Sequence, residues 1–105
     1  MIITTSEKIE DKKIIKTIGY VKGSSARARN AAADVFASLK NIIGGEVEEY
    51  SRLLQQTRDQ AVERMKQDAM AKGANAIVVF RLQSSTIAQG ASEVVAYGTG
   101  VVVED

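Results

Sequence analysis

The segment at positions 93–103 is apolar on both of the faces that a β-strand would present. One face carries Val95, Tyr97, Thr99, Val101 and Val103, and the other carries Val94, Ala96, Gly98, Gly100 and Val102. An antiparallel strand with a solvated side alternates apolar and polar residues, so this segment needs cover on both sides. We therefore expect it to form the central strand of a sheet, antiparallel to a neighbour on each edge.

The rest of the chain supplies three further strands and two helices. β-branched residues predict a short strand over 2–5, alternating residues predict one over 14–22, and a third is predicted over 76–82. Apolar residues three and four apart predict helices over 30–43 and 47–72. Gly23-Ser24-Ser25 is predicted to end the strand at 14–22, Gly73 to close the longer helix, and the polar stretch 83–92 to form a long loop. The sequence thus indicates one α+β domain over residues 1–105, with an antiparallel three-stranded sheet and a short extra N-terminal strand.

Both predicted helices fall between the second and third strands. They form one crossover, and the handedness of such connections places a crossover on a single face of the sheet. Leaving the other face in water would forgo roughly 1.5–3 kcal/mol for each large side chain. A neighbouring subunit, or the short N-terminal strand, is expected to cover that face, which makes Val95, Tyr97, Val101 and Val103 the predicted oligomer interface.

The composition argues against several kinds of function. The 105 residues include no Cys and no His, which removes thiol chemistry, the commonest general base and the commonest metal ligand. Fourteen basic and thirteen acidic residues nearly balance, unlike a dedicated nucleic-acid-binding protein. No stretch is long and apolar enough to span a membrane. We expect a cytoplasmic protein that is not an enzyme and uses no cofactor, with no nucleic-acid or membrane partner.

Two sets of polar residues leave alternatives open. Glu46, Glu48 and Glu49 could bind a hard cation through oxygen atoms, or simply complement the dipole of the helix that begins there. Asn30, Asp34 and Arg58 lie near the predicted buried stripes and are expected to form a structural hydrogen-bond network. An enzyme that uses Asp34 and Arg58 with an unidentified ligand is the remaining alternative.

Three short motifs have structural explanations. Lys22-Gly23-Ser24-Ser25 lacks the residue order of a phosphate-binding loop and is predicted to be a turn. Gly98-Thr99-Gly100 lies within a strand, where glycine favours close packing against another element. Tyr20, Tyr50 and Tyr97 could stack on a ligand, but core packing is the expected role.

The order of several short patterns is similar to that of a known family. The patterns are Gly19-x-Val21-x-Gly23, Asn30-x3-Asp34-x-Phe36-Ala37, Gly44-Gly45-x4-Tyr50, Arg58-x2-Ala61, Ala69-x3-Gly73-Ala74 and Gly98-Thr99-x-Val101. Across essentially its whole length the chain resembles the YbjQ-like family of uncharacterised proteins, which carries the description "putative heavy-metal-binding". The resemblance implies a dodecin-subunit-like fold and a ring-forming homo-oligomer, a pentamer, assembled through short added strands. It implies no established reaction.

The heavy-metal description fits this sequence poorly. Soft heavy metals select thiolates and imidazoles, and the chain contains neither. A metal would have to be held by carboxylates and carbonyls, at a subunit junction or on the axis of a ring. The predicted partner is therefore a second copy of the chain, with a small molecule or metal ion as a further ligand.

Overall fold

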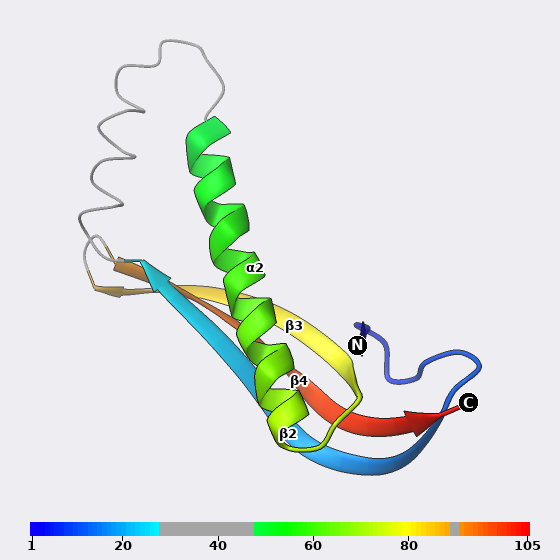
Figure 1. The fold of residues 1–105 in the computed structure, drawn as a ribbon. Helices are drawn as coiled ribbons and strands as arrows, with labels where there is room; N and C mark the ends of the chain where they lie inside the picture. The colour runs from blue at the N-terminus through cyan, green and yellow to red at the C-terminus, as the bar shows by residue number, and fades with distance from the viewer. Residues whose placement is uncertain (28–47, 89–90) are drawn as a thin grey trace.

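The computed structural model of this chain describes residues 1–27, 48–88 and 91–105. Within these residues one helix packs on a four-stranded mixed sheet of order β1-β3-β4-β2 (Figure 1). The elements are β1 at Ile2–Ile3, β2 at Lys13–Arg27, α2 at Glu48–Ala71, β3 at Ala76–Ala88 and β4 at Ala91–Glu104. The predicted α+β class is confirmed, while the helix predicted over 30–43 lies outside the described residues.

Strand β4 occupies the position that its two apolar faces predicted. It pairs antiparallel with β2 along one edge and with β3 along the other. Strand β1 adds to the outer edge of β3 in parallel, with Ile2 opposite Ala76. The predicted short N-terminal strand thus joins the sheet as β1 and makes it mixed and four-stranded, because the N-terminal residues supply hydrogen-bond partners to an edge that would otherwise stay unpaired.

Two predicted strand ends are wrong. Strand β2 continues through Gly23-Ser24-Ser25 to Arg27, because Gly23 marks a close approach of α2 and not a turn. A Cβ atom on Gly23 would lie 2.1 Å from the backbone nitrogen of Met65. Strand β3 likewise runs through most of the predicted loop over 83–92, and its ladder with β4 reaches Ala88 opposite Ala91. Backbone hydrogen bonds to β4 hold this polar stretch in a strand despite its low strand propensity, because strand propensity depends strongly on context.

Helix α2 matches the predicted helix over 47–72. From Thr57 onward its predicted inward stripe is buried and consists of Thr57, Ala61, Met65 and Ala69, whereas Leu54 of the same predicted stripe is 36% exposed. The helix ends at Gly73, whose φ is +93°, and the amide of Ala74 donates to the carbonyl of Ala69 at 2.9 Å. A left-handed glycine with this backward hydrogen bond is a common helix terminus, so the predicted role of Gly73 is confirmed.

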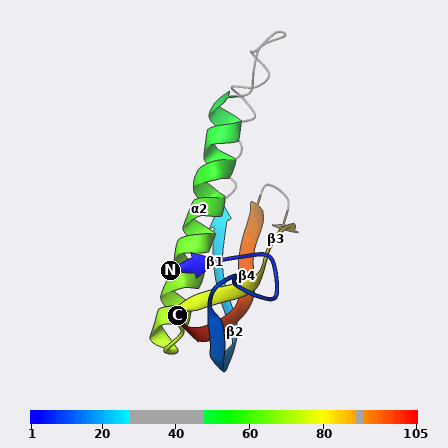
Figure 2. The ribbon, with the colours of Figure 1, turned by 90° about the vertical axis from the view of Figure 1, so that its right-hand side faces the viewer.

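The core lies on both sides of the sheet. On the side of α2, the buried cluster comprises Val21, Ala61, Met65, Ala69, Ala74, Ile77, Val94 and Ala96. On the other side, Ala76, Val78 and Val101 are buried, with Ile9, Ile14, Val79 and Val103 packed against them. Figure 2 shows α2 along one side of the sheet and the N-terminal segment passing the other. The chain thus covers both faces of β4 near its C-terminal end.

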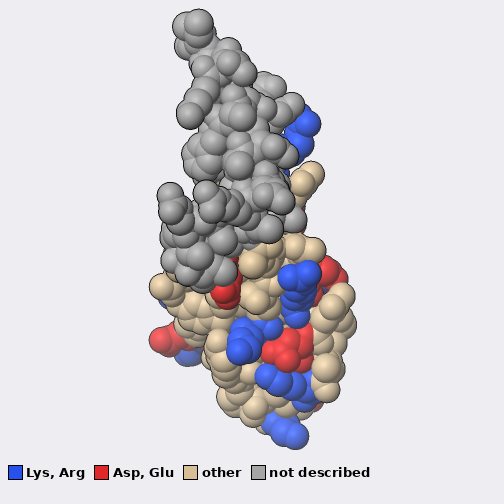
Figure 3. All heavy atoms as spheres, turned by 90° about the vertical axis from the view of Figure 1, so that its left-hand side faces the viewer, with Lys and Arg blue, Asp and Glu red and all other residues tan. Residues whose placement is uncertain are grey.

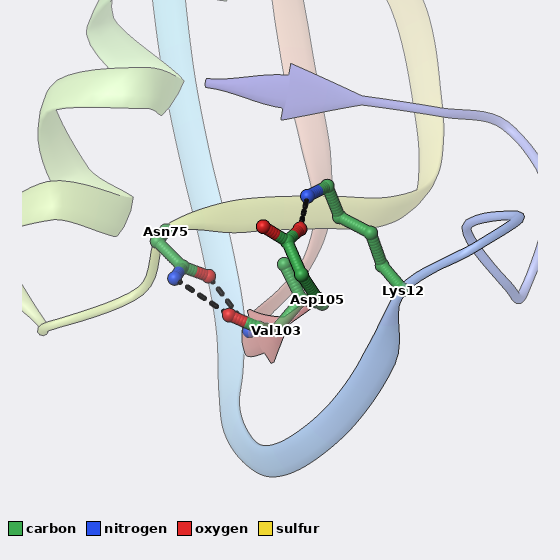
Figure 4. A network of polar contacts seen from close by, with 4 residues as sticks. All are labelled: Lys12, Asn75, Val103 and Asp105. Carbon is green, nitrogen blue, oxygen red and sulfur yellow. Dashed lines mark hydrogen bonds and ion pairs between the residues drawn. The ribbon is translucent and has the colours of Figure 1, made fainter.

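The C-terminal end of β4 is held by a side chain that replaces a strand residue. Strand β3 begins at Ala76. The side-chain carboxamide of the preceding residue, Asn75, forms two hydrogen bonds with the backbone of Val103 (Figure 4). Its Nδ2 donates to the Val103 carbonyl at 3.0 Å, and its Oδ1 accepts from the Val103 amide at 2.8 Å. Lys12 forms an ion pair with Asp105 beside it. These contacts extend the pairing of β4 beyond the start of β3.

Candidate functional site

The side of the sheet opposite α2 is only partly covered by the chain. Val94 and Ala96 face the helix, so their neighbours Val95 and Tyr97 point to the opposite side, where both are half-buried. Tyr97 lies between Lys22 of β2 and Arg81 of β3, and Val95 lies between Ser24 and Gln83. We call this set of six residues the open face; it consists of Lys22, Ser24, Arg81, Gln83, Val95 and Tyr97.

Two of the four predicted interface residues do not belong to the open face. Val101 is only 2% exposed and is buried with Ala76 and Val78. Val103 packs against the same cluster, as does Ile9 of the N-terminal segment. The prediction that Val101 forms an oligomer interface is therefore wrong, because the chain's own N-terminal segment covers that half of the strand. The part that Val95 and Tyr97 play in an interface stays a prediction.

The rim of the open face is polar and partly fixed. The Nη1 of Arg81 donates to the carbonyl of Thr5 at 3.1 Å and to that of Phe80 at 2.8 Å, so its guanidinium is held at the edge of β3. Lys22 is exposed on the opposite flank, and Tyr20 is 58% exposed, which corrects its expected place in the core. An apolar and aromatic centre with a polar rim is typical of a protein–protein contact surface.

The predicted polar network is not supported at the residue that the structure describes. Arg58 is exposed, and its Nη2 donates to Oε1 of Gln55 at 3.2 Å on the helix surface. Arg58 is thus exposed on α2, and its part in a network with Asn30 and Asp34 stays a prediction. Asn30 and Asp34 lie outside the described residues.

The side chains of the predicted acidic cluster lie outside the described part of the structure. Glu46 lies outside the described residues, and Glu48 and Glu49 fall in the first turn of α2, where only the backbone is described. Among the described residues no group of three Asp, Glu, His or Cys side chains could hold a metal ion.

A contact that the sequence did not reveal joins β2 to α2. Ser25 is 1% exposed, and its hydroxyl donates to Oε1 of Gln60 at 2.5 Å. Buried polar groups need such partners, so this bond fixes the position of α2 along β2. The sequence predicts a turn at Gly23-Ser24-Ser25. The one indication that the Ser25 side chain points inward is its position two residues after Gly23 and four after Val21, on the same face of a strand.

Asp68 joins the same two elements near the end of the helix. Its Oδ2 accepts from the backbone amide of Lys22 at 2.9 Å and from Nζ of Lys72 at 3.1 Å. Nζ of Lys72 also donates to the carbonyl of Tyr20 at 3.0 Å. The amide of Lys22 and the charge of Lys72 hold the pKa of the Asp68 carboxyl below its ordinary value.

This shift predicts that part of the stability depends on pH. The pKa of Asp68 is lower in the folded chain than in the unfolded chain, so the carboxylate contributes stability above its unfolded pKa, and this contribution is lost as pH falls through the folded pKa. Asp68→Asn should lower the melting temperature at neutral pH and have a smaller effect at a pH below the ordinary aspartate pKa of about 3.9. Thermal unfolding at both pH values checks this; an effect of equal size at both would contradict it.

On the face that Figure 3 shows, basic and acidic side chains are interspersed over the described residues, so charge singles out no further surface there. None of the helical residues that the structure describes forms a segment long and apolar enough to cross a membrane. The open face is therefore the strongest candidate site.

Comparisons with known proteins agree on one family. Residues 1–104 match the YbjQ family model, described as "Putative heavy-metal-binding". A UPF0145 protein of Clostridioides difficile (strain 630) is 51% identical over 105 residues, covering 100% of this chain and 94% of the relative. A UPF0145 protein of Dehalococcoides mccartyi (strain BAV1) is 50% identical over 104 residues, covering 99% of this chain and 100% of the relative.

A solved structure shares the fold. It is a protein of unknown function of the DUF74 family from Pediococcus pentosaceus ATCC 25745, with a TM-score of 0.68 and 18% sequence identity. The match covers 99% of this chain and 98% of that chain. At this identity the likeness concerns the fold alone.

Proposed function

The chain belongs to the YbjQ family, and from this premise we propose that it is a non-enzymatic protein that works as a homo-oligomer. In this proposal each subunit has a dodecin-subunit-like fold and the subunits close into a ring of five, as the family resemblance implies. The subunit interfaces hold a small ligand or another protein. A cytoplasmic location is part of the same proposal.

The observation that carries the proposal is the incomplete cover of β4. The chain buries the Val101 end of the strand with its own N-terminal segment, but Val95 and Tyr97 remain only partly buried on a central strand. Tyrosine is enriched at protein interfaces because its ring is apolar and its hydroxyl can stay hydrated. A second copy placed on the open face would remove both side chains from water.

The residues of this chain fit a heavy metal poorly. The family description names such a ligand, yet the sequence contains no Cys and no His. Carboxylates and carbonyls prefer hard cations, so an oxygen-ligand site repeated around the ring is the form that a metal site would take here. No contact among the described residues favours that alternative over the interface.

Mutation of the open face tests the proposal. Tyr97→Glu should shift the protein toward the 11.3 kDa monomer, because a charge in a desolvated interface centre weakens association by about 2 kcal/mol or more. Native mass spectrometry and sedimentation at micromolar concentration give the subunit number. Gln67→Glu, which adds the same charge at an exposed position of α2, is the control and should assemble like the unmodified protein. An unmodified chain that is monomeric under these conditions would refute the proposal.

A further inference from the structure

The outer edge of β2 carries backbone groups that β4 does not use. Among the described strands, β2 lies at one end of the sheet and pairs with β4 alone. Every second residue of an antiparallel edge strand directs its amide and its carbonyl away from the neighbouring strand. Such an edge can pair with a strand of another chain unless it is protected. The partners of the outward groups on β2 therefore indicate whether this edge is available.

Three side chains of α2 bind outward groups of β2. The contacts are Nη1 of Arg64 to the Ser24 carbonyl at 2.6 Å, the Lys22 amide to Oδ2 of Asp68 at 2.9 Å, and Nζ of Lys72 to the Tyr20 carbonyl at 3.0 Å. Two carbonyls thus receive a donor and the amide between them receives an acceptor, which is what an added strand would offer to the same atoms. We call these three side chains, Arg64, Asp68 and Lys72, the clasp.

The spacing of the clasp follows from helix and strand geometry. Its members lie four residues apart on α2, which advances about 6 Å over four residues. The strand residues that they contact lie two apart, and two strand residues advance about 6.8 Å. Because the two repeats nearly match, a helix that runs antiparallel to an edge strand can meet successive outward groups. Helix α2 packs on β2 in this direction (Figure 1), and Gly23 allows the close approach, since a Cβ there would lie 2.1 Å from the Met65 nitrogen.

The beginning of the β2 edge is protected in other ways. Two register shifts interrupt its pairing with β4, between Ile14 and Lys16 and between Thr17 and Gly19. Irregular register and exposed lysines, such as Lys16, are common protections of edge strands. Residues 20–24 keep a regular register with β4, and it is there that the clasp binds.

We propose that the clasp closes the β2 edge, so that removing it turns residues 20–24 into a surface that pairs with a strand of another chain. In such a variant the added strand is the β2 edge of a second copy, because the same groups are then free on both chains. The inference is independent of the open face and of the proposed self-association. It differs from a purely structural role of the clasp, because that role predicts a loss of stability and no new association.

A triple variant tests the proposal, and the helix offers a matched control. The variant Arg64→Ala/Asp68→Ala/Lys72→Ala should let the Lys22 amide exchange its hydrogen about tenfold or more faster, because the hydrogen bond to a charged group is lost. It should also form species larger than those of the unmodified chain in sedimentation over a concentration series. The control, Arg58→Ala/Asp59→Ala/Lys66→Ala, changes the net charge equally, leaves the clasp intact and should sediment like the unmodified chain.

Two further variants separate edge pairing from a loss of stability. Met65→Ala weakens the core but keeps the clasp, so it should not form the larger species. Lys22→Pro added to the triple variant removes the outward amide, which an edge strand tolerates, and should abolish the larger species. If the triple variant does not fold, Asp68→Ala alone exposes the same amide and is measured in the same way. The proposal is overturned if the clasp variant that folds sediments like the unmodified chain, if Met65→Ala forms the same species, or if those species persist with Lys22→Pro.

Discussion

Gly23→Ala is expected to lower the free energy of unfolding by about 3 kcal/mol or more, at the upper end of what overpacking costs. The added Cβ would lie 2.1 Å from the Met65 nitrogen and 2.3 Å from the Ala61 carbonyl oxygen. Both atoms belong to the helix backbone, which cannot rotate away as a flexible side chain can. Relief therefore requires α2 to move off β2, which would also strain the bonds that Gln60, Arg64 and Asp68 make to the strand.

Thermal and urea unfolding at one fixed protein concentration measure this effect, since association can shift apparent stability. For a chain of this size the expected loss corresponds to a fall in melting temperature on the order of 15 °C. Ser24→Ala is the matched control, because Ser24 is exposed and its backbone carbonyl stays available to Arg64. If the Gly23→Ala and Ser24→Ala proteins have the same melting temperature, α2 does not approach β2 as closely as proposed.

Met65→Ala should destabilise the chain by about 3 kcal/mol, within the usual range for truncating a buried methionine. Met65 is fully buried at the centre of the cluster between α2 and the sheet, together with Val21 and Ile77. Its removal leaves a cavity that the strands cannot close, because β4 is fixed by ladders on both edges. The loss should appear in the unfolding free energy with little change in the helix content of the folded protein.

Met70→Ala provides the comparison on the same helix. Met70 is 55% exposed, so the same change should shift stability by no more than about 0.5 kcal/mol. Urea unfolding of both variants under identical conditions gives the difference directly. Equal losses in the free energy of unfolding at the two positions would mean that α2 presents a different face to the sheet.

Local sequence signals identified the elements that have a strong pattern of their own. The 3–4 spacing of Thr57, Ala61, Met65 and Ala69 placed the long helix, and Gly73 marked its end. The two apolar faces of residues 94–103 placed β4 at the centre of the sheet, because a strand of this composition needs cover on both faces. Each of these signals reflects a requirement of the segment itself.

Local signals failed where a distant part of the chain determines the role of a residue. Gly23-Ser24-Ser25 resembles a turn until α2 lies across it, and Gln83-Ser84-Ser85 resembles a loop until β4 pairs with it. The bulge at Val79 and the N-terminal cover of Val101 likewise depend on residues more than sixty positions away. The prediction that Val101 belongs to an interface was wrong for this reason.

The sequence alone determined the class of the domain, the long helix, the central strand and the lack of thiol and imidazole chemistry, because these follow from residue types and their spacing. Only the tertiary structure decided which half of β4 the N-terminal segment covers and how closely α2 approaches β2. Those properties depend on contacts between α2, β2 and the N-terminal segment, and such contacts leave no periodic trace in any one of the three.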